Sequence, residues 1–185
     1  VTWFGGKRRK DATGYDFAHL IVGSEGTLAV VTKIILKLLP QPGKVVDLLV
    51  PFPDVASAID FAPRIQSEGK VIPSSIEFMD GKSIRLAERF LNTILPYDDA
   101  GAHLVIQLEG NDPNVLADDM ERIGDLCLAS GALEVFVADN KTTSDKLWKA
   151  RKCLAEAIMA FYPKYSLEDL VVPTSEIPKL MAETT

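Results

Sequence analysis

The stretch His103-Leu104-Val105-Ile106-Gln107-Leu108-Glu109 decides the fold class, because the character of its side chains alternates along its length. Leu104, Ile106 and Leu108 fall on one side of a strand, and the residues between them fall on the other. A strand of a parallel sheet is expected to be almost continuously apolar, whereas a strand of an antiparallel sheet commonly has one solvated face. The stretch therefore predicts a one-sided antiparallel sheet.

Strand and helix signals alternate on both sides of this stretch, from residue 45 onwards. Predicted strands cover residues 45–50, 74–79, 103–109, 134–138 and 169–172. Predicted helices cover residues 54–67, 80–90, 112–130 and 143–160, and a last one begins at Thr174 or Ser175. Such alternation alone would indicate a parallel α/β sheet, but the strands are short and mixed in polarity. We therefore expect an α+β fold of ferredoxin-like type with a mixed or antiparallel sheet.

Polar residues and glycine mark the ends of these helices. Asp54 is expected to cap the first helix. Asp112-Pro113 starts the third, because proline suits the first helical turn, and that helix is expected to end near Ser130-Gly131. Thr143 or Ser144 is predicted to cap the long fourth helix.

The clearest linker signal is Pro40-Gln41-Pro42-Gly43, where we place a domain boundary. It divides the chain into residues 1–41 and residues 42–185. Before the boundary, residues 20–22 and 28–39 are rich in Ile, Val and Leu and are predicted to be strands. Asp16 is expected to cap a short helical turn ahead of them.

Composition indicates an ordinary globular protein. Of the 185 residues, 47% are hydrophobic and 25% are charged, and no apolar run approaches the ~20 residues that cross a bilayer. The net charge of −6 argues against a nucleic-acid binder, and the basic run at residues 7–10 is expected to be a solvated turn. The chain opens on Val1 without a signal peptide, so we expect a piece of a longer protein in the cytoplasm.

Neither the cysteines nor the histidines predict a metal site. Cys127 and Cys153 lie far apart in predicted helices and are expected to be small core residues in a reducing compartment. His19 and His103 have no second histidine or cysteine at ligand spacing. The acidic pairs at residues 98–99 and 118–119 lack a third ligand and are expected to be solvated.

The run Gly23-Ser24-Glu25-Gly26-Thr27-Leu28 is the stretch most indicative of chemistry, since two glycines flank a Ser-Glu pair between apolar segments. Glycine has no Cβ, so it accepts positive φ angles and lets another molecule approach the backbone closely. A site lined by backbone in this way suits a flat or phosphorylated cofactor.

This run, with Thr13-Gly14-Tyr15-Asp16 before it and Leu36-Lys37-Leu38-Leu39-Pro40 after it, resembles one family. It is similar to the FAD-linked oxidoreductases of the glycolate oxidase and D-lactate dehydrogenase type, within the vanillyl-alcohol oxidase superfamily. Later segments resemble the same family in the same order, and they lie at residues 75–80, 104–110, 147–151 and 168–173.

The resemblance implies FAD as the cofactor. Residues 1–41 are then the end of the FAD-binding domain, and residues 42–185 are a substrate or cap domain that is incomplete at its C-terminus. The residues implied to bind the cofactor are Gly23, Ser24, Glu25, Gly26, Thr27, Leu28, Ala29, Val30 and Val31. The glycine-rich pyrophosphate loop and the histidine-rich segment of the family lie outside this stretch. We therefore assign it no catalytic residue and no metal ligand, and expect it to lack turnover by itself.

Arg151 is the candidate for substrate binding, because in the family an arginine after the Leu-Trp pair grips the substrate carboxylate. A guanidinium is a rigid fork that matches a carboxylate with two hydrogen bonds. The alternative is an ordinary helix-surface arginine near Asp145 or Glu156. Glu77 and Glu109 lie at strand ends, and the default expectation for them is solvation.

The parent enzyme implied by the resemblance oxidises a small 2-hydroxy acid, such as glycolate, D-lactate or D-2-hydroxyglutarate, with FAD. The resemblance does not specify its electron acceptor. It also does not decide whether the enzyme forms a homo-oligomer, assembles with other oxidase subunits or associates with the periphery of the membrane. Two alternatives remain open: a non-catalytic binding or regulatory module of ferredoxin-like fold, and a flavin-free accessory subunit.

Overall fold

The computed structural model describes residues 1–97 and 99–184. The chain divides into two compact units, Val1–Gln41 and Pro42–Thr185. None of the helices in the described ranges has the length and apolar character needed to cross a membrane.

The first unit contains the short helix α1 (Phe17–Ile21), which Asp16 caps as predicted. One carboxylate oxygen of Asp16 accepts from the backbone N–H of His19 at 3.0 Å, and the other lies 2.6 Å from the His19 ring. These two contacts lower the pKa of the Asp16 carboxyl.

The strands predicted at residues 20–22 and 28–39 are wrong, because the first range overlaps α1 and the second forms no strand in this unit. A strand needs a hydrogen-bonded neighbour, and no described segment of Val1–Gln41 supplies one. The apolar side chains of Ile34, Leu36 and Leu38 are consequently exposed.

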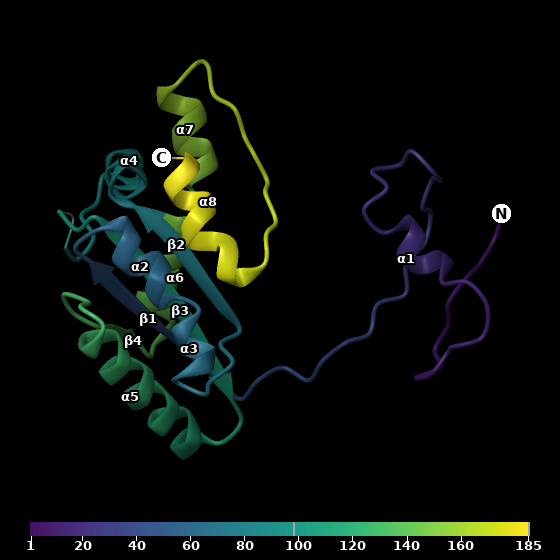
Figure 1. Ribbon diagram of the computed structural model, residues 1–185, viewed down its shortest axis with the longest axis horizontal. Coiled ribbons are helices and arrows are strands. Elements are labelled where there is room, and N and C mark those ends of the chain that lie inside the picture. The colour runs from purple at the N-terminus through teal and green to yellow at the C-terminus, as the bar shows by residue number, and fades with distance from the viewer. Residues whose placement is uncertain (98, 185) are drawn as a thin grey trace. The chain divides into compact units, whose positions relative to one another are not determined.

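The second unit is built on a four-stranded sheet of β1 (Lys44–Phe52), β2 (Ser75–Asp80), β3 (Ala102–Gly110) and β4 (Phe136–Ala138). The strand order is β2-β3-β1-β4, and all three pairings are antiparallel (Figure 1). β1 and β3 pair along their whole lengths, from Lys44 opposite Gly110 to Phe52 opposite Ala102. This order is that of the ferredoxin-like fold, so the predicted fold class is confirmed.

The helices follow the strands nearly as predicted. They are α2 (Val55–Phe61), α3 (Arg64–Ser67), α4 (Gly81–Leu91), α5 (Pro113–Ala129), α6 (Lys141–Lys152), α7 (Leu154–Phe161), the 3-10 turn η1 (Thr174–Glu176) and α8 (Ile177–Thr184). Asp54 caps α2 by accepting from the Ser57 N–H, and Asp112 caps α5 with Pro113 in its first turn. The end of α5 at Ser130, before Gly131 with φ +91°, is also as predicted.

Three predicted features near the C-terminus are wrong. Asn140, not Thr143 or Ser144, caps α6, because its side-chain oxygen accepts from the Thr143 N–H at 3.0 Å. The predicted long helix is broken at Cys153 into α6 and α7. Residues 169–172 form no strand, since they have no paired neighbour among the described strands.

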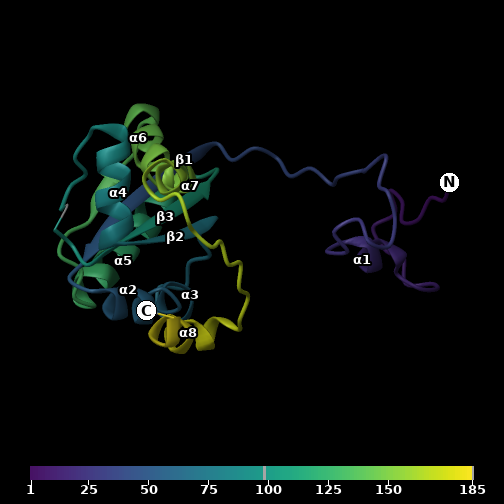
Figure 2. The same cartoon turned by 90° about the horizontal axis from the view of Figure 1, so that it is seen from above.

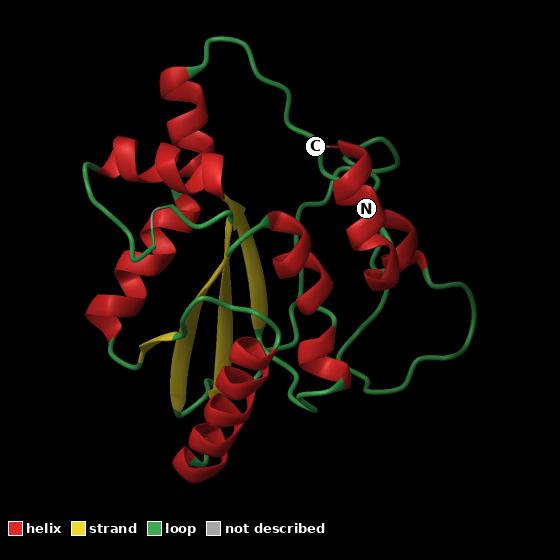
Figure 3. Cartoon of the chain, turned by 60° about the vertical axis from the view of Figure 1, so that its left-hand side comes forward, coloured by secondary structure: helices red, strands yellow, loops and turns green. Residues whose placement is uncertain are grey.

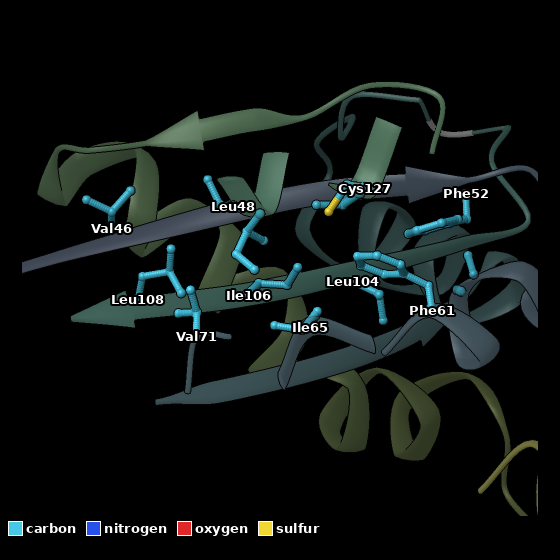
Figure 4. Close-up of a cluster of buried hydrophobic side chains, with 14 of the residues drawn as sticks. Val46, Leu48, Phe52, Phe61, Ile65, Val71, Leu104, Ile106, Leu108 and Cys127 are labelled. Atoms are coloured by element: carbon cyan, nitrogen blue, oxygen red, sulfur yellow. The ribbon is translucent and has the colours of Figure 1, made fainter. Parts of the chain in front are cut away.

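One face of the sheet packs against α2, α3 and α5. Figure 4 shows this cluster, in which side chains of β1 and β3 meet Phe61 of α2, Ile65 of α3 and Cys127 of α5. Leu48, Leu104 and Ile106 are fully buried at its centre. Burial of Cys127 raises the pKa of its thiol to about 12, which makes it the inert core residue that was predicted.

The opposite face is also covered, so the prediction of a one-sided sheet is wrong. There Leu49, Met79 and Val105 of the sheet pack against α4 and α6 in a second buried cluster that also contains Cys153. Figure 2 shows the sheet between α4, α6 and α7 on one side and α2, α3 and α8 on the other, and the strands are yellow in Figure 3. Two polar residues of β3 misled the prediction because they bond inside the protein: His103 lies 2.9 Å from the Pro96 carbonyl, and Gln107 donates to Asp47.

Candidate functional site

The second face of the sheet brings Arg151 of α6 to Glu77 of β2, 74 residues away in the sequence. The Nε of Arg151 donates to a carboxylate oxygen of Glu77 at 2.9 Å, and the two side chains are 36% and 31% exposed. Arg151 does not pair with Asp145, which instead contacts Lys141 at 3.1 Å, and the interpretation of Arg151 as an ordinary helix-surface arginine stays the alternative prediction. The expectation that Glu77 is merely solvated is wrong, because Glu77 forms this ion pair.

The Arg151 guanidinium is only partly used by this pair. Among the described residues, Glu77 is its one hydrogen-bond partner and it engages Nε alone, so neither terminal nitrogen is bound. A guanidinium has five N–H donors in a planar fork, and its two terminal nitrogens together match a carboxylate. The side chain is therefore held through Nε, and its two terminal nitrogens keep their donors unused within the described residues.

Helix α6 presents Arg151 because three of its residues repeat at helical spacing on one face. Ser144, Leu147 and Arg151 lie three and four residues apart, which places them in line toward the sheet. Leu147 is buried in the second cluster between the two polar contacts. Helix α6 therefore contacts the sheet through the apolar side chain of Leu147 and, on either side of it, through the polar side chains of Ser144 and Arg151.

At the Ser144 end of α6, the Ser144 hydroxyl contacts a buried carboxylate that was not predicted from the sequence. Asp47 of β1 is 0% exposed, and it accepts from Gln107 Nε2 at 2.8 Å and from the Ser144 hydroxyl. A detectable signal was present, since Asp47 interrupts the otherwise apolar run of residues 45–50. A carboxylate inside such a strand needs internal donors, because burial without them is costly.

His103, the other buried polar residue of this face, is 0% exposed. Its Nε2 lies 2.9 Å from the Pro96 carbonyl oxygen and its Nδ1 is buried without a partner. A donor is needed opposite a carbonyl, so Nε2 carries the proton. Burial lowers the pKa of the imidazole, which keeps it neutral as a structural residue.

The predicted cofactor segment lies in the first unit and forms an open turn. Gly23 and Gly26 have φ of +82° and +77°, with open space where a Cβ would project. Glu25 between them also has a positive φ of +49°. Thr27 closes the turn by donating its N–H to the Ser24 carbonyl at 2.9 Å and its hydroxyl to the same oxygen at 2.6 Å.

This turn and the residues after it fit an acceptor-rich cofactor such as a flavin nucleotide. In the part of the chain that the structure describes, the N–H groups of Glu25, Gly26 and Leu28 have no hydrogen-bond acceptor. Unpaired backbone donors beside open space are what phosphate or ring acceptors need. Leu28, Ala29, Val30 and Val31 further line a hollow of about 470 Å³ within this unit.

No group of three or more His, Cys, Asp or Glu residues at metal-binding distances occurs within the described ranges. Asp98 of the acidic pair at residues 98–99 lies outside the described residues. Asp119 of the other pair contacts Arg122 at 3.4 Å.

Comparison with known proteins agrees with the resemblance inferred from the sequence. The family described as "FAD linked oxidases, C-terminal domain" matches residues 41–185. D-lactate dehydrogenase of Anaerostipes hadrus is 31% identical over 100% of this chain and 40% of its own length. Glycolate oxidase subunit GlcD of Bacillus subtilis is 36% identical over 96% of this chain and 37% of its own length. The chain thus spans well under half the length of these relatives.

A solved structure of alkyldihydroxyacetonephosphate synthase has the same fold, with a TM-score of 0.62 at 20% identity over 92% of this chain and 36% of that one. At that identity the likeness concerns the fold alone. Because the family model matches residues 41–185, most of the chain, the chain belongs to the FAD-linked oxidases, whose cofactor is FAD.

Proposed function

We propose that this chain is part of a flavin-dependent oxidoreductase that oxidises a small 2-hydroxy acid, with glycolate and D-lactate as the first candidates. Relatives at 31–36% identity are named for these two acids. The observation that carries the proposal is the Arg151 side chain, which is 36% exposed and whose guanidinium bonds to the described residues only through Nε.

In this proposal Arg151 binds the carboxylate of the substrate. A 2-hydroxy acid carries its carboxylate next to the carbon that is oxidised, so binding at the carboxylate fixes the position of the reacting C–H bond. A guanidinium suits this task, because it stays charged and offers parallel N–H donors. Arg151 is a binding group, and the catalytic base is assigned to residues outside this stretch.

When bound, FAD would supply the redox chemistry, as the two-electron acceptor that oxidation of a 2-hydroxy acid to a 2-oxo acid requires. In this proposal residues 1–41 are the end of the FAD-binding domain, and residues 42–185 are the substrate or cap domain. Gly23 to Val31 would hold the cofactor through the open backbone donors of Glu25, Gly26 and Leu28.

The whole enzyme would act in the cytoplasm or at the membrane periphery and pass its electrons to an acceptor. Two relatives are named as a subunit of glycolate oxidase. We therefore propose that other oxidase subunits accompany the full-length protein.

The test is steady-state oxidation of glycolate and D-lactate by the full-length protein with FAD. Arg151→Gln removes the charge and is expected to raise KM for the better acid at least tenfold, because a charge-assisted hydrogen bond to the carboxylate is lost. Arg64→Gln is the matched control, since Arg64 also pairs with a glutamate but on the exposed surface of α3. An unchanged KM in Arg151→Gln would remove the assignment of the carboxylate to Arg151.

A second test concerns the isolated stretch. Residues 1–185 hold only part of the cofactor pocket implied by the family, so they are expected to bind FAD weakly and to show no turnover with either acid. Tight FAD binding by these residues, measured by flavin fluorescence titration, or a robust rate of oxidation would contradict this expectation.

A further inference from the structure

We propose that Glu77 is a positioning residue that orients the Arg151 guanidinium toward the substrate carboxylate. The inference rests on the proposed role of Arg151 and adds a second residue to it. Glu77 accepts from Nε at 2.9 Å, which holds the planar group at Nε, and among the described residues neither terminal nitrogen makes a hydrogen bond.

The mode of pairing supports this role when it is compared with another pair in the same molecule. Arg64 and Glu68 form two parallel hydrogen bonds, from Nε at 2.6 Å and from Nη2 at 2.8 Å. That arrangement occupies two donors of the fork and satisfies both carboxylate oxygens. Glu77 takes Nε alone, so the Arg151 fork keeps its full terminal edge for a second carboxylate.

Both partners stand on well-fixed elements. Glu77 lies in the middle of β2, opposite Val105 of the central strand β3. Arg151 lies in α6, whose other end is tied to the sheet by Ser144 and the buried Asp47, with Leu147 packed between. A binding group held by neighbours on rigid elements loses less conformational entropy when ligand binds.

Two substitutions of Glu77 distinguish the effect of its hydrogen bond to Arg151 from the effect of its negative charge. Glu77→Ala removes the acceptor and is expected to raise KM for glycolate or D-lactate about tenfold in the full-length holoenzyme, with kcat within about twofold. Glu77→Gln keeps an oxygen that accepts from Nε and is expected to restore KM to within about threefold of wild type. Glu68→Ala, which breaks the exposed pair of α3, is the matched control and is expected to leave KM unchanged.

A double-mutant cycle shows whether Glu77 acts through Arg151. Adding Glu77→Ala to Arg151→Gln is expected to change KM no further, because the oriented group is already gone. If Glu77→Ala raises KM as much in that background as in wild type, Glu77 does not act through Arg151 and the inference fails.

The outcomes also distinguish this inference from the proposed function. If Arg151→Gln raises KM and Glu77→Ala does not, the proposed function stands and the positioning role is overturned. If Arg151→Gln leaves KM unchanged, the proposed function itself fails. A fall in KM in both Glu77 variants would mean that Glu77 repels the substrate instead of serving it, and would also overturn the inference.

Glu77→Met keeps the test decisive if Glu77→Ala does not fold. Methionine preserves the length of the side chain without an acceptor, so it is expected to reproduce the tenfold rise in KM in a protein that still binds FAD. A normal KM in a folded Glu77→Met holoenzyme would overturn the inference.

Discussion

Asp47 is the residue whose environment departs most from what its type predicts, since it is a carboxylate with 0% exposure in the central pair of strands. Gln107 and Ser144 donate to its two oxygens, so its burial depends on neighbours from β3 and α6. Asp47 therefore links the sheet to the helix that carries Arg151.

Asp47→Ala is expected to lower the free energy of unfolding by about 2 kcal/mol, because the donors of Gln107 and Ser144 lose their acceptor inside the protein. Urea unfolding of the chain measures the change. Asp125→Ala on the exposed surface of α5 is the control and is expected to stay within about 0.5 kcal/mol of wild type. Equal stability of the two variants would show that the Asp47 network contributes nothing.

His103 predicts a pH dependence of stability. Burial places the pKa of the folded state below its usual value of 6.5. The unfolded chain therefore binds more protons in the window just below pH 6.5, and stability falls as pH drops through it toward the folded-state pKa. Denaturant unfolding from pH 7 to 5 is expected to show this loss in wild type and in His19→Gln, and to show less of it in His103→Gln. If His103→Gln loses as much stability as wild type over this pH range, groups other than His103 cause the pH dependence.

At the scale of residues, the sequence predicted local contacts well and distant ones poorly. Asp16 and Asp54 were identified as caps because a cap contacts N–H groups two or three residues away, and Asp112-Pro113 was identified as the start of α5 from its proline. The pairing of Glu77 with Arg151 could not be predicted in this way, because it depends on how α6 crosses the sheet. The positions of the cofactor residues relative to FAD remain predictions.

At the scale of elements, α6 depends on a cap that the sequence analysis placed three or four residues too late. Asn140 accepts from the N–H and from the hydroxyl of Thr143, so it fixes where the helix begins. The start of α6 determines which residues face the sheet, since a shift of one residue turns the helix by about 100°.

Asn140→Ala is expected to lower the free energy of unfolding by about 1 kcal/mol, because the first turn of α6 loses its side-chain acceptor. Thermal or urea unfolding measures the loss. Thr142→Ala, an exposed neighbour in the first turn, serves as control and should not destabilise the protein comparably. If both variants lose the same stability, the cap at Asn140 is not what stabilises the start of α6.

The predicted strands show where element prediction fails. Residues 103–109 became β3 because neighbouring strands lie on both of its edges. Residues 28–39 are equally rich in Ile, Val and Leu, but no strand of their own unit pairs with them. Apolar composition therefore indicated the capacity to form a strand, and the presence of a partner decided the outcome.

At the scale of the whole molecule, the sheet order identifies the ferredoxin-like class, and the second helical layer is what distinguishes this domain from a one-sided sheet. That second layer carries Arg151. The layer that misled the fold prediction is thus the one to which the proposed function assigns substrate binding.

The most direct test of the central claim is the visible absorbance of FAD in the full-length protein, recorded without oxygen while glycolate or D-lactate is added. We predict that the flavin bands bleach in the wild-type protein, and that Arg151→Gln needs at least tenfold more acid for the same bleaching. Flavin bands that stay unchanged with every 2-hydroxy acid would contradict the account.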